Sequence, residues 1–403
     1  MLQRRIIEKA AVGMAVLIGL AMVVGPERVD PLLSAILGLK APKQVSEPPV
    51  PRADEVMVRV LDTVKEEPIR ALMAEFTQHR SRVPGYPGHD AAADFIERRF
   101  QEMGLERVET ESYGVTSPVD QGGTLTVLGT GEQFPVHGVW PNLVKTSSLP
   151  QGGIRSRLVY GGDGQFKSFN GKDVEGAVVL MEFNTWNKWL NAAILGAQQV
   201  VFIEPDSTFY TQAEQKFLQV PNSIERFWID RASGRKLQQM LAERGTLEIE
   251  MKSQMIWEKN ETRNILGWIS GTDEVLREKI IVINAYYDAM SVVPALAPGA
   301  EMACGIVGLM ELARYLRKYP PKHTVLFLAS SGHHLGFRGI CDFLSRHSRK
   351  EKHFAALVTD PIPIPLMISL DLTSQTDEIG VWNSTRNFYY KRFFTPFGKT
   401  FIR

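Results

Sequence analysis

Three mainly apolar runs in the second half of the chain constrain its fold most strongly. They cover residues Lys279–Asn284, Thr324–Ala329 and Leu366–Leu370. Between the first two, Ala303–Lys318 carries apolar residues at the three- and four-residue spacing of a helix. Strands that are apolar on both faces must be covered on both faces, which is typical of sheets built from strand–helix–strand units. We therefore predict an α/β fold whose sheet has helices on both faces.

Polar residues of metal-binding type follow these three predicted strands. Asp288 follows the first, His333 and His334 follow the second, Asp371 follows the third, and Glu301 opens the intervening helix. Ligands of open α/β sheets collect outside the carboxyl ends of the strands. Carboxylates and imidazoles are also the oxygen and nitrogen ligands of zinc sites. The pattern predicts that these side chains meet on one rim and form a metal site.

Ordinary structural roles remain open for each of these residues. An aspartate such as Asp371 can cap a turn. Glu301 at a helix start interacts favourably with the helix dipole whatever else it does. Adjacent histidines, as at His333 and His334, can also lie in solvent on a loop. The prediction of a site therefore depends on all the segments reaching the same rim.

The composition excludes several classes of protein. The chain has 403 residues, of which 44% are hydrophobic and 23% charged. These values exclude wholesale disorder, a fibrous repeat and a membrane protein of many helices. The formal net charge of +1 gives no basic footprint, so we expect no nucleic-acid partner. Cys304 and Cys341 are too few for a disulfide scaffold; we expect two buried free thiols, with a single bridge as the alternative.

The N-terminus has the pattern of a membrane-targeting segment. Arg4, Arg5 and Lys9 precede an uncharged run from residue 10 to residue 25, and a basic region before an apolar one is typical of a secretory signal. We predict a signal anchor over 1–28, with a cleaved signal peptide, a twin-arginine signal and a buried helix as alternatives. Basic residues on the N-terminal side favour a cytoplasmic N-terminus and place the bulk of the chain on the extracytoplasmic side. The proline-rich linker, residues 29–54, would separate the two.

After the linker, the sequence pattern changes from helical periodicity to short β-like runs. Val58, Leu61 and Ile69 belong to a periodic pattern that predicts helix after residue 54, and a second helix over Asp90–Met103 ends at a glycine suited to a C-cap. Between about 120 and 250, short β-like runs alternate with glycine and asparagine turns. They are Thr124–Leu128, Arg157–Tyr160, Ala177–Glu182 and Gln199–Ile203.

The sequence resembles the dizinc aminopeptidase family, metallopeptidase family 28. The resemblance rests on the segments IIVINAYYDA, PGAEMACGIVGLMELAR, HTVLFLASSGHHLGFRGICDFL and MISLDL, and upstream on SRVPGYPGHDAAADFIERRFQEMGLERVE. The text LVYGGDGQFKSFNGKDVEGAVVLMEF resembles a protease-associated domain, a common insertion in this family. The resemblance implies an aminopeptidase-like mixed sheet formed by residues 55–119 and 251–403, with a mainly-β protease-associated domain at 120–250.

The resemblance also implies a role for each rim residue, and several family residues are replaced. Tyr286 stands where the family has a histidine ligand of the first metal, while Asp288, which orients that histidine, is retained. Glu301 takes the place of the metal-bridging aspartate. His333 replaces the general-base glutamate, and His334 replaces the adjacent glutamate ligand. The aspartate ligand, Asp371, is kept.

These replacements differ in their chemical consequences. Glu301, His334 and Asp371 are acceptable zinc ligands, and His333 has the pKa range of a general base. Tyr286 is a poor ligand, because a neutral phenol with a pKa near 10 binds zinc weakly. The family's final histidine ligand would follow Asp371, but no histidine occurs there. Only 32 residues follow it (403 − 371), so we expect a C-terminally incomplete peptidase-like domain.

We therefore expect a membrane-anchored pseudopeptidase that keeps the aminopeptidase fold for binding or assembly, with a peptide or protein as its ligand. The transferrin receptor ectodomain is a peptidase-like member of this kind. The alternative is an active aminopeptidase with one zinc on Glu301, His334 and Asp371 and with His333 as the base. A third reading is a different hydrolytic or acyl-transfer chemistry in the same cleft, as in the related glutaminyl cyclases. The oligomeric state is open.

Overall fold

The structure is a computed structural model that describes residues 53–142, 144–217, 222–347 and 362–373. Its helices are α3 (Ala53–Thr63), α4 (Glu66–Phe76), α5 (Pro87–Glu102), α6 (Leu190–Ile194), α7 (Tyr210–Phe217), α8 (Arg231–Arg244), α9 (Ala303–Lys318) and α10 (Arg338–His347). Its strands are β1 (Val108–Val127), β2 (Glu132–Gly138), β3 (Ile154–Gly162), β4 (Val178–Glu182), β5 (Gln199–Ile203), β6 (Glu225–Ile229), β7 (Leu247–Ile269), β8 (Ile280–Tyr286), β9 (Thr324–Ser330) and β10 (Leu366–Ser369). Three short 3-10 turns are η1 (Phe166–Phe169), η2 (Leu276–Glu278) and η3 (Pro294–Leu296).

The predicted signal anchor, 1–28, and nearly all of the linker, 29–54, lie outside the described residues. Within the described ranges, no helix is both long enough and apolar enough to cross a membrane.

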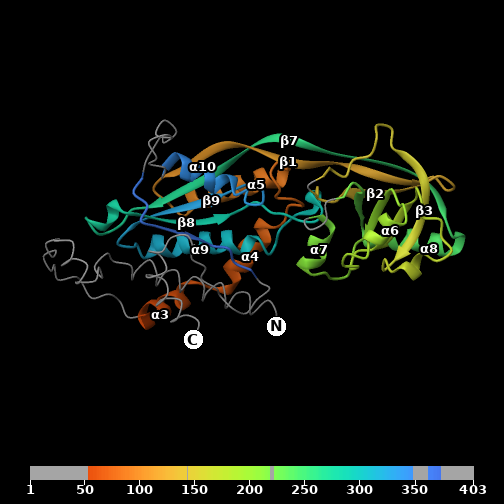
Figure 1. The fold of residues 1–403 in the computed structure, drawn as a ribbon. Coiled ribbons are helices and arrows are strands. Elements are labelled where there is room, and N and C mark those ends of the chain that lie inside the picture. Colours follow the sequence, from red (N-terminus) through yellow and green to blue (C-terminus); the bar gives the residue numbers. More distant parts are fainter. Residues whose placement is uncertain (1–52, 143, 218–221, 348–361, 374–403) are drawn as a thin grey trace, which may run out of the picture.

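The described strands form one sheet, in the order β1-β2-β6-β5-β4-β3-β7-β9-β8-β10. The antiparallel pair β1 and β7 holds it together, because these two strands pair from Val108 opposite Gly267 to Val127 opposite Ile249. Figure 1 shows both strands running along the length of the molecule, from the α10 region to the α8 region. The predicted boundaries at 119/120 and 250/251 fall inside β1 and β7. The division into two domains stays a prediction.

In the half of the molecule that holds β8, β9 and β10, helices cover both faces of the sheet. These three strands are parallel to one another. As in any β-strand, successive side chains point to opposite faces of the sheet. Ile281 and Ile283 pack in the cluster that includes α4, α5 and α9. Val282 packs on the other face with Phe343 of α10. The mixed α/β architecture with helices on both faces is confirmed, and the predicted strands and α9 lie within two residues of their expected bounds.

The segment predicted to be mainly β is mixed α/β instead. Its strands β3, β4, β5 and β6 are parallel neighbours, and helices accompany them on both faces. Ala192 of α6 packs with Val179 and Phe202, while Leu237 of α8 packs with Leu180 on the opposite face. Parallel strands need a long crossover, and a helix usually provides it. The short strands were recognisable in the sequence, but the amphipathic helices between them were not.

The helices before β1 differ from expectation in one respect. Val58 and Leu61, predicted to face the core, are exposed, and Val60 is buried instead. The helix is interrupted between α3 and α4, which changes the face presented on either side of the break. The C-cap prediction after α5 is confirmed, since Gly104 has φ +71°, a conformation that glycine adopts without steric cost.

The two cysteines are free thiols, as predicted, but neither is buried. Cys304 is of intermediate exposure and Cys341 is exposed.

Candidate functional site

The parallel register of β10, β8 and β9 brings the predicted residues to one edge of the sheet. Tyr286 at the end of β8 lies opposite Ser330 at the end of β9, and Ser369 at the end of β10 lies opposite Asn284. The next residues along each chain segment therefore leave the sheet side by side. This placement is what strand ends in a parallel sheet predict.

Tyr286 contacts Asp371 directly. Its hydroxyl donates a hydrogen bond of 3.0 Å to Oδ1 of Asp371. Burial, followed by the negative charge of Asp371, raises the pKa of the Tyr286 phenol above its usual range. The phenol is therefore neutral at physiological pH and acts as a hydrogen-bond donor to the carboxylate.

His333 and His334 complete an aromatic group with Tyr286. The His333 ring stacks on the Tyr286 ring, with 3.9 Å between centroids and an interplanar angle of 23°. The His334 ring lies 4.9 Å from that of His333, edge to face. Burial lowers the pKa of both imidazoles, that of His334 to about 4. Both are therefore neutral at pH 7, and Nε2 of His334 is buried without a hydrogen-bond partner among the described residues.

Asp288 lies beneath this group and is almost fully buried. Its Oδ1 accepts a hydrogen bond of 3.2 Å from the backbone N–H of His333. Its Oδ2 has no hydrogen-bond partner within the described ranges. Burial raises the pKa of this carboxyl to about 6, against the stabilising effect of the His333 N–H. Asp288 therefore holds the His333 loop in place through the backbone.

Glu301 lies in the turn before α9 and does not open the helix, which begins at Ala303. The backbone N–H of Cys304 donates to the Glu301 carbonyl at 3.1 Å, and the Thr373 hydroxyl donates to its carboxylate. Its charge also contributes to raising the pKa of the Cys304 thiol to about 11, after burial. The turn thus presents Glu301 to the segment that follows Asp371.

Arg82, which the sequence did not single out, connects this turn to the end of β8. The side chain is fully buried. Its Nε donates to the Tyr287 carbonyl at 2.9 Å, and its two Nη atoms donate to the carbonyls of Pro298 and Gly299. Burial lowers the pKa of Arg82 to about 10, opposed by the charge of Asp288. Arg82 is therefore charged at neutral pH, and it fixes the chain on both sides of the loop between Asp288 and Glu301.

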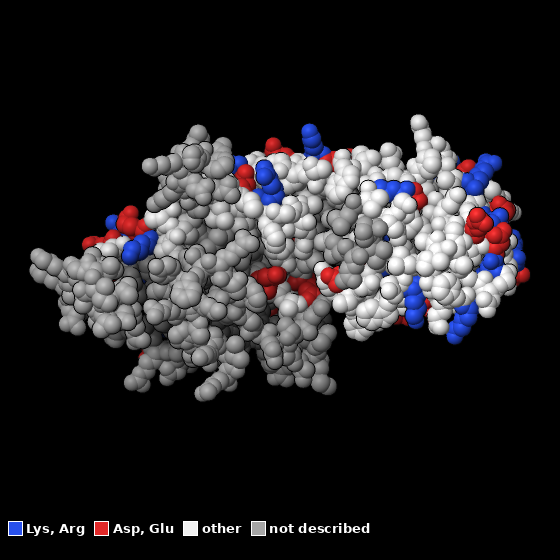
Figure 2. All heavy atoms as spheres, in the orientation of Figure 1, with Lys and Arg blue, Asp and Glu red and all other residues white. Residues whose placement is uncertain are grey.

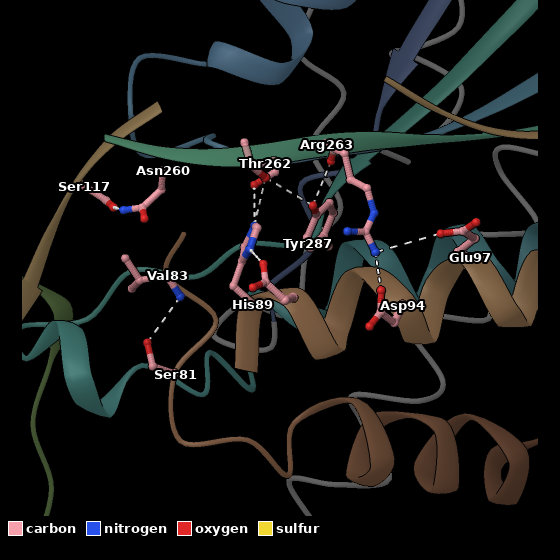
Figure 3. Close-up of polar contacts among 12 residues, drawn as sticks. Ser81, Val83, His89, Asp94, Glu97, Ser117, Asn260, Thr262, Arg263 and Tyr287 are labelled. Carbon is pink, nitrogen blue, oxygen red and sulfur yellow. Dashed lines mark hydrogen bonds and ion pairs between the residues drawn. The ribbon is translucent and has the colours of Figure 1, made fainter. Parts of the chain in front are cut away.

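A second missed residue, His89, fixes the loop that carries the two histidines. Figure 3 shows its buried ring extending from α5 towards Thr262 of β7. Its Nε2 lies 2.8 Å from Oγ of Ser331 and 3.1 Å from Oγ1 of Thr262, and the ring stacks on that of Tyr287. Tyr287 in turn donates to the Arg263 carbonyl at 2.7 Å. Neither residue had a signal in the sequence, since each is recognised only by its buried contacts with distant segments.

The rim residues do not fit a two-zinc centre. Among the residues that the structure describes, no three His, Cys, Asp or Glu side chains are grouped so that they could hold a metal ion. Structural and catalytic zinc sites take three or four protein ligands, and a neutral phenol occupies Oδ1 of Asp371 here. The assignments of Glu301, His334 and Asp371 as ligands, and of His333 as the base, stay predictions.

The buried carboxyl of Asp288 makes stability depend on pH. Its ordinary pKa of 3.8 rises to about 6 in the folded chain, so its stabilising contribution is complete below about pH 4 and is lost as the pH rises through 6. Asp288→Asn keeps the Oδ1 acceptor and cannot ionise. We expect this variant to exceed the wild type in free energy of unfolding by ~3 kcal/mol at pH 7.5. Urea unfolding at pH 7.5 and pH 4 tests this, since the advantage must disappear at pH 4.

Comparison with known proteins finds a similarity to one family. Residues 264–386 match the model of peptidase family M28. No protein of curated function shows a match. Among solved structures, the zinc aminopeptidase BSAP from Bacillus subtilis superposes with a TM-score of 0.50 at 19% identity, covering 71% of this chain and 66% of that one. This chain therefore spans slightly less than two thirds of the length of that enzyme.

Two further structures align less closely. The aminopeptidase from Aneurinibacillus sp. strain AM-1 has a TM-score of 0.41 at 19% identity, covering 78% of this chain and 72% of that one. A peptidase M28 precursor from Shewanella amazonensis SB2B has a TM-score of 0.44 at 15% identity, covering 73% and 68%. At this identity the Bacillus subtilis structure establishes the fold alone. The chain therefore has an aminopeptidase-like fold, and its predicted resemblance to peptidase family M28 is confirmed.

Proposed function

We propose that this chain is a membrane-anchored, aminopeptidase-like ectodomain that binds or assembles and does not hydrolyse peptides. The hydrogen bond from Tyr286 to Asp371 carries the proposal. Tyr286, which stands where the family has a histidine ligand, is an uncharged donor to Asp371, the aspartate that matches a family ligand. A carboxylate that accepts a phenol O–H has less capacity for a metal, and a phenol with a raised pKa does not ionise to replace the lost imidazole.

The two histidines support the same conclusion. His333 stands in the position of the general base, but its ring stacks on Tyr286 and burial lowers its pKa. A lowered pKa weakens an imidazole as a base towards water. The His333 and Tyr286 side chains thus pack against each other, as side chains do in a surface that has no catalytic role.

The membrane attachment and the partner class are parts of the proposal. Residues 10–25 would anchor the chain with its bulk on the extracytoplasmic side, and a peptide or protein would be the ligand. On the face drawn in Figure 2, the Lys and Arg side chains of the described residues lie among Asp and Glu side chains and form no broad basic patch. This distribution favours a protein or peptide over nucleic acid.

Metal content and hydrolysis of the purified full-length chain test the proposal. We expect substoichiometric zinc and no turnover of aminoacyl p-nitroanilides above the blank. The double variant Tyr286→His with His333→Glu is expected to bind more zinc than the wild type, because it restores two family residues. Stoichiometric zinc together with hydrolysis in the wild type would refute the pseudopeptidase assignment.

The alternative function is a single-zinc aminopeptidase that uses Glu301, His334 and Asp371. The unpartnered Nε2 of His334 favours it, because a buried imidazole nitrogen without a hydrogen bond is available to a ligand. In that case Glu301→Ala and His334→Ala must each remove the zinc and the activity. Glu274→Ala, at an exposed position away from the rim, is the matched control and must leave both unchanged.

A further inference from the structure

A cavity of about 450 Å³ lies apart from the rim, between the two halves of the sheet. One wall comes from Arg80 and from residues 291–296, which follow β8. The other wall comes from the ends of β2, β4, β5 and β6. None of the rim residues of the candidate site lines it. Its volume falls within the range of ~300–1,000 Å³ that is typical of small-molecule sites, towards the lower end.

His137 of β2 gives the cavity an oriented imidazole. Its Nδ1 lies 3.3 Å from Oδ2 of Asp120, whose side chain is fully buried. The backbone N–H groups of Gly138 and Gly122 also donate to this carboxylate, at 3.2 and 3.1 Å. A carboxylate fixed by several donors sets the tautomer and orientation of the imidazole it contacts. Nε2 has no hydrogen-bond partner within the described residues, and the ring lines the cavity.

Charges of opposite sign enter the cavity from its two walls. Arg80 is exposed and forms no ion pair with the residues that the structure describes. The carboxylates of Glu204 and Asp230 come from the other half of the sheet. Each accepts one backbone N–H, from Arg231 at 3.1 Å and from Ser233 at 3.0 Å. One oxygen of each carboxylate is thus left for a ligand, and the ion pair of Arg231 goes to a different residue, Asp206.

An apolar surface lies between these charges. Phe183 and Trp228 both line the cavity, and their rings meet edge to face with 5.2 Å between centroids. Val293 and Leu296 contribute aliphatic side chains from the opposite wall. The lining therefore has a cation, Arg80, on one wall, and two carboxylates with an oriented imidazole on the other. The aromatic surface lies beside that imidazole, because His137 pairs with Trp228 across β2 and β6.

We propose that this cavity binds a small zwitterion, namely an apolar amino acid or a dipeptide with free termini. The ligand carboxylate would pair with Arg80, and Nε2 of His137, on the opposite wall, would accept a hydrogen bond from the ligand ammonium. The ligand ammonium would pair with Glu204 and Asp230, and its apolar side chain would pack on the aromatic rings. The site is a binding site without a reaction. It does not depend on whether the rim is catalytic.

Isothermal titration of the full-length chain with leucyl-phenylalanine tests this proposal. We expect saturable binding that is weakened at least tenfold, or ~1.4 kcal/mol, by Arg80→Met. The loss should equal that caused by amidating the ligand carboxylate, and amidation should then cost nothing further in the variant. Glu204→Gln should do the same for N-acetylation of the ligand. Arg70→Met and Glu243→Gln, at exposed positions outside the cavity, are the matched controls.

Two outcomes overturn the proposal. The first is no binding of leucyl-phenylalanine to the wild type. The second is binding that survives Arg80→Met and Glu204→Gln but is lost in Glu301→Gln, which would place the ligand at the rim. Mass spectrometry of the titrated ligand keeps the proposed function separate, because cleaved dipeptide contradicts the pseudopeptidase assignment whichever variant pattern is found.

Discussion

Replacement of Arg82 by methionine is expected to lower the free energy of unfolding by ~4 kcal/mol. The guanidinium is fully buried and donates to the carbonyls of Tyr287, Pro298 and Gly299. Methionine fills much of the same volume but removes all three hydrogen bonds, and hydrogen bonds to charged groups contribute ~1.5–3 kcal/mol each. The Gly299 carbonyl keeps a donor in the Ala303 N–H, so the loss comes mainly from the Tyr287 and Pro298 carbonyls. It also removes the positive charge that acts on Asp288.

Arg80→Met is the matched control for this experiment. Arg80 lies two residues earlier but is exposed and has no ion-pair partner among the described residues. Its replacement should change the free energy of unfolding by less than ~0.5 kcal/mol. Urea unfolding followed by tryptophan fluorescence measures both variants. A loss below ~1 kcal/mol for Arg82→Met would show that the Tyr287 and Pro298 carbonyls find other donors, and that Arg82 does not fix the loop.

Arg82 and His89 fix the backbone from which the rim side chains extend. The Arg82 hydrogen bonds lie on both sides of the segment between Asp288 and Glu301, and His89 holds Ser331 immediately before the His333 loop. The positions of the rim side chains are therefore determined by buried polar contacts beneath them.

The sequence predicted the three parallel strands and the edge at which they end, for a physical reason. A strand buried on both faces must be apolar throughout, so β8, β9 and β10 were visible as runs, and α9 as a periodic segment. The parallel arrangement then placed Asp288, His334 and Asp371 at one edge. Both predictions depend on short stretches of sequence and on a general rule of sheet topology.

Long-range features were not predictable in the same way. β1 and β7 are longer than any run in the sequence suggests, because the middle of each strand alternates between buried and exposed residues and contains polar ones such as Ser117 and Asn260. The two sequence positions pair only in the folded sheet. Arg82 and His89 were missed because the burial of a polar side chain depends on donors and acceptors from distant segments, and local sequence carries no trace of these.

Lys216, in the last turn of α7, is expected to make the free energy of unfolding depend strongly on pH. Its side chain is fully buried; Nζ donates to the Trp186 carbonyl at 2.7 Å and lies 5.1 Å from the centre of the Phe183 ring. Burial lowers the pKa of this amine from 10.5 to about 7. Between these values the unfolded chain binds a proton that the folded chain does not, so stability rises with pH.

The comparison of wild type with Lys216→Met isolates this effect, because other groups that titrate at high pH are common to both. Each pH unit adds ~1.4 kcal/mol to the free energy of unfolding, as long as the amine is protonated in the unfolded chain only. From pH 7.5 to pH 10 the wild type should therefore gain ~3 kcal/mol relative to the variant. Lys188→Met, at an exposed position in the same half of the molecule, should show no such pH-dependent difference. If urea unfolding gives the same difference between wild type and Lys216→Met at both pH values, the amine is solvated in the folded chain. Its contacts with Trp186 and Phe183 would then not involve a desolvated charge.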